Sequence, residues 1–132
     1  MDAAQSLAEL TEISSQVLAA AIVDGGGVVA STLADGTPLA DAGRALLEQA
    51  AAARNGAEPT QVEVATEEGS VFVLRDGDRT IVATTGPRPT VGLVFYDLKS
   101  ALRSAEEAKP KPKAKAKPKP RAPRKKKPAD ET

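Results

Sequence analysis

The sequence predicts an α/β domain over residues 1–107, followed by a basic segment over residues 108–132 that we expect to be disordered. The domain is expected in the order α-β-β-α-β-β-β-α. Two observations support this order: apolar residues recur at helical spacing in three stretches, and short runs rich in β-branched residues, bounded by turn residues, lie between them. The chain has 132 residues, which is enough for one domain and an appendage.

The first helix is expected over residues 2–14. Ser6 and Glu9 have the spacing of a capping box, and Leu7, Leu10 and Ile13 recur at helical intervals. The continuous apolar run 17–23 follows, and it is typical of a strand buried on both faces. Glycines at 25–27 allow a tight hairpin turn into a return strand over residues 28–33.

The second helix is expected to run from Pro38 to about residue 54. Thr37 is a candidate cap, Pro38 suits the first helical position, and Asn55-Gly56 ends the helix. One side of this helix carries small and apolar residues, which would allow another backbone to approach closely and favour a helix–helix contact. The side chains on this stripe are Leu39, Ala42, Ala45, Leu46, Gln49 and Ala53.

Three strands are expected next, over residues 60–66, 70–75 and 79–85. In the first of them, Val62 and Val64 lie on one face, and Gln61 and Glu63 lie on the other. This strand would be an exposed edge with no proline and few charges, so it is prone to pair with another strand. The second strand is apolar on both faces and is therefore expected to be central.

The last helix is expected over residues 90–107. Leu93, Tyr96, Ala101 and Leu102 are predicted to face the sheet, with Val94, Leu98 and Ala105 alongside. The β-branched and aromatic stretch 91–96 leaves a strand as the alternative for the start of this region.

A net charge of zero conceals two oppositely charged parts. Of the 18 Lys and Arg residues, 11 lie from Lys109 onward, where two acids oppose them, so this segment carries +9 and the rest of the chain −9. A flexible cationic arm attracts phosphates without reading sequence, which predicts contact with a nucleic acid or another polyanion. Three alternatives remain: the arm folds back on the acidic domain, touches an anionic membrane peripherally, or only aids solubility. The predicted polyanion-binding residues are Lys109, Lys111, Lys113, Lys115, Lys117, Lys119, Arg121, Arg124, Lys125, Lys126 and Lys127.

Several kinds of chemistry are disfavoured. The chain has no cysteine and no histidine, so thiol catalysis, cysteine zinc sites and His-dependent triads are excluded. The glycines at 25–27 formally fit a dinucleotide fingerprint, but β-branched residues follow them where a helix is required. The carboxylate pairs 67/68 and 76/78 lie in turns, and Arg88 is interpreted as a loop arginine rather than an arginine finger. We expect a cytoplasmic protein with no cofactor, metal or catalytic residue.

The order of elements resembles the Roadblock/dynein-light-chain family. The likeness is carried by residues 20–31 as the first hairpin, 69–76 as the fourth strand and 91–98 as the start of the last helix. The resemblance covers residues 2–103, and the lysine- and proline-rich arm, which is similar to those of linker histones, is not part of the family pattern.

The resemblance implies a five-stranded antiparallel sheet with the second helix on one face and the other two helices on the opposite face. It also implies a homodimer formed through the second helix and the third strand, by way of Leu39, Ala42, Ala45, Leu46, Gln49, Ala53, Val62 and Val64. Bacterial members of the family regulate or scaffold Ras-like small GTPases. The alternative function is a sequence-independent nucleic-acid-binding protein whose folded body only dimerises.

Overall fold

The computed structural model describes residues 2–25, 27–56 and 60–107, so the predicted basic segment 108–132 lies outside the described residues. Its elements follow the predicted order. They are α1 (Ala3–Ile13), β1 (Val17–Asp24), β2 (Gly27–Ser31), α2 (Thr37–Ala53), β3 (Gln61–Ala65), β4 (Ser70–Asp76), β5 (Arg79–Thr85) and α3 (Val91–Glu107). The last region is therefore a helix from Val91, and the strand alternative for residues 91–96 is wrong.

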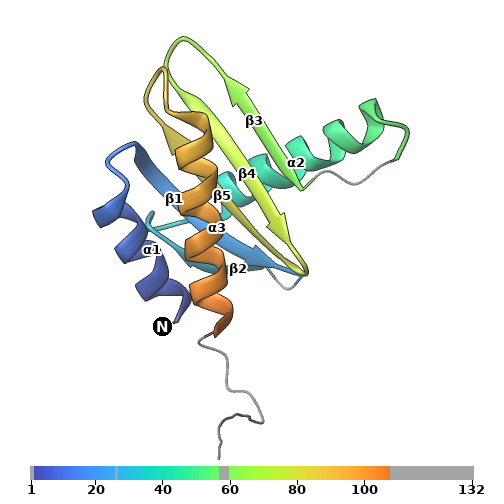
Figure 1. Cartoon of the computed structure of the whole chain (residues 1–132). Coiled ribbons are helices and arrows are strands. Elements are labelled where there is room, and N and C mark those ends of the chain that lie inside the picture. Colours follow the sequence, from blue (N-terminus) through green and yellow to red (C-terminus); the bar gives the residue numbers. More distant parts are fainter. Residues whose placement is uncertain (1, 26, 57–59, 108–132) are drawn as a thin grey trace, which may run out of the picture.

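The five strands form one antiparallel sheet in the order β2-β1-β5-β4-β3. Helices α1 and α3 cover one face of this sheet, and α2 crosses the other (Figure 1). The expected α/β architecture is confirmed, with β4 inside the sheet and β3 at its edge.

Two apolar clusters, one on each face of the sheet, hold the layers together. Between the sheet and the helices α1 and α3, the largest buried side chain is Phe72, whose ring meets that of Phe95 edge-to-face at 5.0 Å. On the other face, Val73 and Val82 pack under α2. Successive residues of a strand point to opposite faces, so the same strand supplies both clusters.

The first helix is capped one turn earlier than predicted. Asp2 is the N-cap: its Oδ1 accepts from the Gln5 N–H at 2.8 Å, and its own N–H donates to Gln5 Oε1 at 3.2 Å. The predicted capping residue, Ser6, lies inside the helix and is 2% exposed. Its backbone N–H is already bonded to the Asp2 carbonyl at 2.9 Å, so the Ser6–Glu9 capping box was wrong.

Thr37 does not cap α2, because the helix already includes it and the N-cap position falls on Gly36. Asp35 supports this start instead, accepting the Thr37 N–H on Oδ1 at 3.0 Å. Hydrogen bonds from the Thr37 backbone, and then from its side chain, hold the pKa of Asp35 below its ordinary value. The predicted stop is confirmed: Asn55 and Gly56 have positive φ, and the Gly56 N–H donates to the Ala51 carbonyl at 2.7 Å.

The rotation of α3 about its axis differs from the prediction. Leu93 and Tyr96 were expected to face the sheet, but they are 50% and 68% exposed. Val94 and Leu98 are fully buried in their place, and Ala101, Leu102 and Ala105 continue the same stripe. Each residue turns a helix by about 100°, so the choice of Val94 over Leu93 moves Leu93 and Tyr96 away from the sheet.

Candidate interaction sites

The outer side of α2 carries three alanines and one glutamine that are open to a partner. Ala42, Ala45, Gln49 and Ala53 are all exposed, as the predicted self-association stripe requires. Leu46 is half-buried against the sheet, and Leu39 is only 9% exposed, so little of Leu39 remains available to a partner.

Gly43 brings this helix close to the sheet. A Cβ at position 43 would lie 2.3 Å from Cγ2 of Val82, so a larger residue would push α2 outward. Sequence reasoning missed this role. The available signal was a glycine inside an otherwise good helix pattern, which costs stability unless close packing requires it.

The free edge of β3 lies beside this helix. Val62 and Val64 pair with Val73 and Val71 of β4, and they point to the face of the sheet that α2 covers. Val64 is 37% exposed and Val62 is half-buried. The structure therefore brings the predicted α2 and β3 residues to the same face at one end of the sheet.

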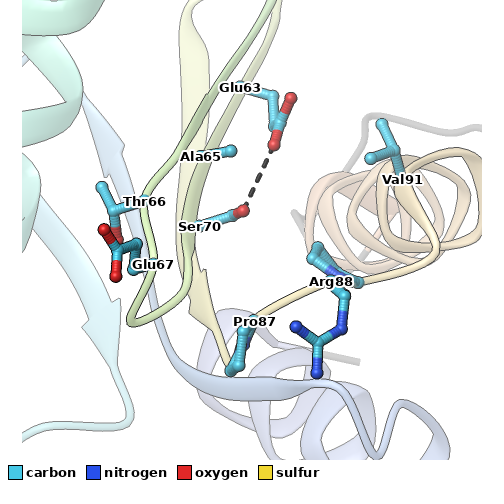
Figure 2. Close-up of a pocket in the computed structure, with 9 residues that line it drawn as sticks. Glu63, Ala65, Thr66, Glu67, Ser70, Pro87, Arg88 and Val91 are labelled. Carbon is cyan, nitrogen blue, oxygen red and sulfur yellow. Dashed lines mark hydrogen bonds between the residues drawn. The ribbon is translucent and has the colours of Figure 1, made fainter.

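A second site lies on the opposite face of β3, where a cleft of about 780 Å³ separates the β3–β4 turn from the start of α3. Glu63, Ala65 and Ser70 point into this cleft from the strands, and Val91 points back toward them from α3 (Figure 2). The Ser70 hydroxyl donates to Glu63 Oε2 at 3.2 Å. Sequence reasoning placed Glu63 on this face of the strand but had no signal for the residues of the other wall.

Gly69 shapes the turn beside this cleft. Its φ is +156°, and a Cβ there would lie 2.0 Å from the Thr85 carbonyl oxygen, so only glycine fits. The turn is closed by Thr66, whose hydroxyl donates to the Gly69 carbonyl at 2.7 Å. These constraints hold the β3–β4 turn against the end of β5, which fixes one wall of the cleft.

Arg88 forms part of the other wall in a left-handed backbone conformation, with φ 57° between two prolines. This conformation is costly for a non-glycine residue, and the residue before a proline is restricted further. The Arg88 guanidinium points away from Glu63 (Figure 2). Arg88 also lines a smaller pocket of about 270 Å³ together with Gln16 and Leu18.

The remaining sequence motifs have structural positions. Strand β2 begins at Gly27, so the helix that a dinucleotide site needs after these glycines is not there. Within the described ranges, no three His, Cys, Asp or Glu side chains gather closely enough to hold a metal ion. Of the helices in this same part of the chain, none is long and apolar enough to cross a bilayer.

The architecture defines a Roadblock/LC7-type fold. The Roadblock/LC7 domain from Streptomyces avermitilis superposes with a TM-score of 0.69 at 16% identity, covering 81% of this chain and 97% of that one. Myxococcus xanthus MglB gives 0.63 at 22% identity, covering 81% and 96%. An MglB solved in a tetrameric arrangement gives 0.60 at 18% identity, covering 80% and 85%.

These likenesses establish the fold of the chain. No protein-family model matches the sequence, and no curated protein matches it significantly.

Proposed function

We propose that the chain is a non-catalytic regulator or scaffold of a Ras-like small GTPase and works as a homodimer. The observation that carries this proposal is the exposed stripe on α2 beside the free edge of β3. The Roadblock/LC7-type fold supports it, because the resemblance implies self-association through these two elements. The MglB structure with a tetrameric arrangement shows that a protein of the same fold can self-associate.

The physical case rests on two complementary surfaces. Small side chains on α2 let a second helix approach closely along a 17-residue element about 25 Å long. The unpaired edge of β3 can add a strand from the second copy, which would continue the sheet across the dimer. Both surfaces lie on the same side of the domain, so one two-fold contact could cover them together.

The dimer is tested by Ala45→Arg, which places a long cation in the middle of the stripe. Light scattering coupled to gel filtration should give twice the 13.6 kDa chain mass for the unchanged protein and the single chain mass for the variant. Ala8→Arg is the matched control, because Ala8 is an exposed alanine on α1. A protein that is monomeric at all concentrations, or an Ala45→Arg variant that stays dimeric, contradicts this interface.

The GTPase partner is tested by affinity capture with a Ras-like small GTPase from the same organism. The GTPase is loaded with GDP or with a non-hydrolysable GTP analogue. We expect retention of the GTP-analogue form and weaker retention with Ala45→Arg, if the partner recognises the dimer. Failure to bind in both nucleotide states contradicts the regulatory proposal.

A second candidate function is sequence-independent binding of a polyanion by the C-terminal segment. Its support is the separation of charge, with +9 from Lys109 onward. Both core clusters lie between Ala3 and Ala105, so a chain ending at Ala108 retains them. Retention of duplex DNA should be lost in that truncated chain and should weaken steeply with salt in the full one. Retention that survives truncation or is insensitive to salt contradicts this candidate.

A further inference from the structure

The cleft beside Glu63 lies on the opposite face of β3 from the side chains of the proposed dimer surface. Val62 and Val64 point to the α2 face of the sheet, whereas Glu63 and Ala65 point to the face of α1 and α3. The proposed dimer contact uses Val62 and Val64, whereas the cleft is lined by the alternate side chains of the same strand.

The chemistry of the cleft fits a lysine side chain. Its walls near Glu63 include Ala65, Pro87 and Val91, which can cover the four methylenes of a lysine stem. Glu63 supplies a carboxylate whose one described hydrogen bond comes from Ser70, so acceptor positions remain for an ammonium group. Arg88 also lines the cleft, but its guanidinium points away from Glu63 (Figure 2). No cation of the described ranges forms an ion pair with Glu63.

We propose that this cleft binds a lysine of the chain's own C-terminal segment, with Glu63 as the ion-pair partner. The segment carries +9 and the rest of the chain −9, so the two attract each other before any specific contact forms. The prolines of the repeat Lys-Pro-Lys-Pro add short apolar surfaces between the cations, which suit a cleft walled by proline and valine.

The length of the C-terminal segment determines which of its lysines can reach the cleft. The cleft lies at the start of α3, and the segment leaves from its other end, 17 residues or about 25 Å away. An extended chain covers about 3.1 Å per residue, so about eight residues beyond Glu107 span the return. Lysines from Lys115 to Lys119 are therefore the first that can enter the cleft.

This contact would hold the C-terminal segment, the basic arm, against the folded domain. An arm that occupies the cleft is not free to bind a polyanion, so the apparent affinity for the polyanion falls with the free fraction of the arm. A partly exposed ion pair changes such an equilibrium by about two- to fivefold. The cleft therefore acts as a weak internal competitor for the basic segment.

Carbodiimide cross-linking, which joins a carboxylate to an amine in direct contact, tests the proposal on the full chain at low salt. Peptide mass spectrometry should find lysines 115–119 linked to Glu63 about threefold more often than to Glu68, an exposed carboxylate in the same turn. About 1 M salt shortens the screening length to about 3 Å and should abolish this preference.

Two variants separate docking from general charge attraction. Glu63→Gln removes the charge but keeps an oxygen that can accept from Ser70, so the turn is preserved. In that variant the links from lysines 115–119 to the neighbouring Glu67 should also fall about threefold, because the arm no longer docks. Glu68→Gln should leave the links to Glu63 unchanged. Links spread evenly over all exposed carboxylates, or links to Glu67 that Glu63→Gln leaves intact, would overturn the proposal.

Discussion

Gly43 marks the closest approach of α2 to the sheet, so Gly43→Ala tests how tightly the helix is seated. The added Cβ would lie 2.3 Å from Cγ2 of Val82, which is fully buried. Either α2 moves away from the sheet or Val82 leaves its preferred rotamer. Both responses disturb the same helix that carries the proposed dimer stripe.

The expected size of the effect comes from two opposing contributions. Alanine is favoured over glycine in a helix interior by about 1 kcal/mol. Overpacking a well-filled core costs about 1–3 kcal/mol. We therefore expect Gly43→Ala to lower the free energy of unfolding by about 1 kcal/mol. Gly92→Ala in α3 is the matched control, because nothing lies within 4 Å of a Cβ there, and it should be neutral or slightly stabilising.

Urea unfolding followed by circular dichroism, at one fixed protein concentration, measures these differences. Val82→Ala removes two buried methyl groups and should cost about 1–3 kcal/mol alone, while making room for a Cβ at position 43. The double variant should then be up to about 2 kcal/mol more stable than the sum of the two single changes predicts, because the overpacking cost is relieved. A Gly43→Ala protein that gains stability like Gly92→Ala would refute the close contact between α2 and Val82.

Three other predictions concern the core, the first helix and acid stability. Phe72→Ala should lower the free energy of unfolding by about 3–5 kcal/mol because Phe72 is fully buried, whereas Tyr96→Ala should change it by less than about 0.5 kcal/mol in the same assay. If Tyr96→Ala lowered the free energy of unfolding as much as Phe72→Ala, Tyr96 would be buried and the observed rotation of α3 would be contradicted. Asp2→Ala should lower the free energy of unfolding by about 1 kcal/mol, because the N-cap of α1 is lost. An unchanged urea midpoint would show that Asp2 does not cap this helix. Asp35 should titrate below its ordinary pKa in an NMR pH titration. Its stabilising contribution is present above the unfolded pKa and is lost as the pH falls through the lower folded value. An ordinary pKa would mean that Thr37 does not bond to Asp35.

Much of the architecture could be predicted because the signals were local. Helical spacing and β-branched runs gave the order of all eight elements, since the periods of 3.6 and 2 residues are properties of a short stretch of chain. The same reasoning placed Val62 and Val64 on one face and Glu63 on the other, which the register with β4 confirms. The Asn55-Gly56 stop of α2 was predictable because positive φ is a property of single residues.

The features that the sequence pattern could not predict depend on contacts between segments that are distant in the chain. Leu93 and Val94 are both apolar, and only packing against the sheet selected Val94 for burial. The role of Gly43 depends on Val82, 39 positions further along the chain, so no local rule exposes it. The cleft beside Glu63 is formed by two segments about 25 residues apart, which meet because β3, β4 and β5 pair in register and α3 returns over them.

The sequence by itself therefore determined the order of the elements, the two faces of β3 and the separation of a basic segment from an acidic domain. The tertiary structure decided which apolar residues are buried, how close α2 lies to the sheet, and where a carboxylate meets apolar walls. The reason is physical: periodicity and turn chemistry act over a few residues, whereas burial and clefts arise only when the layers close on one another.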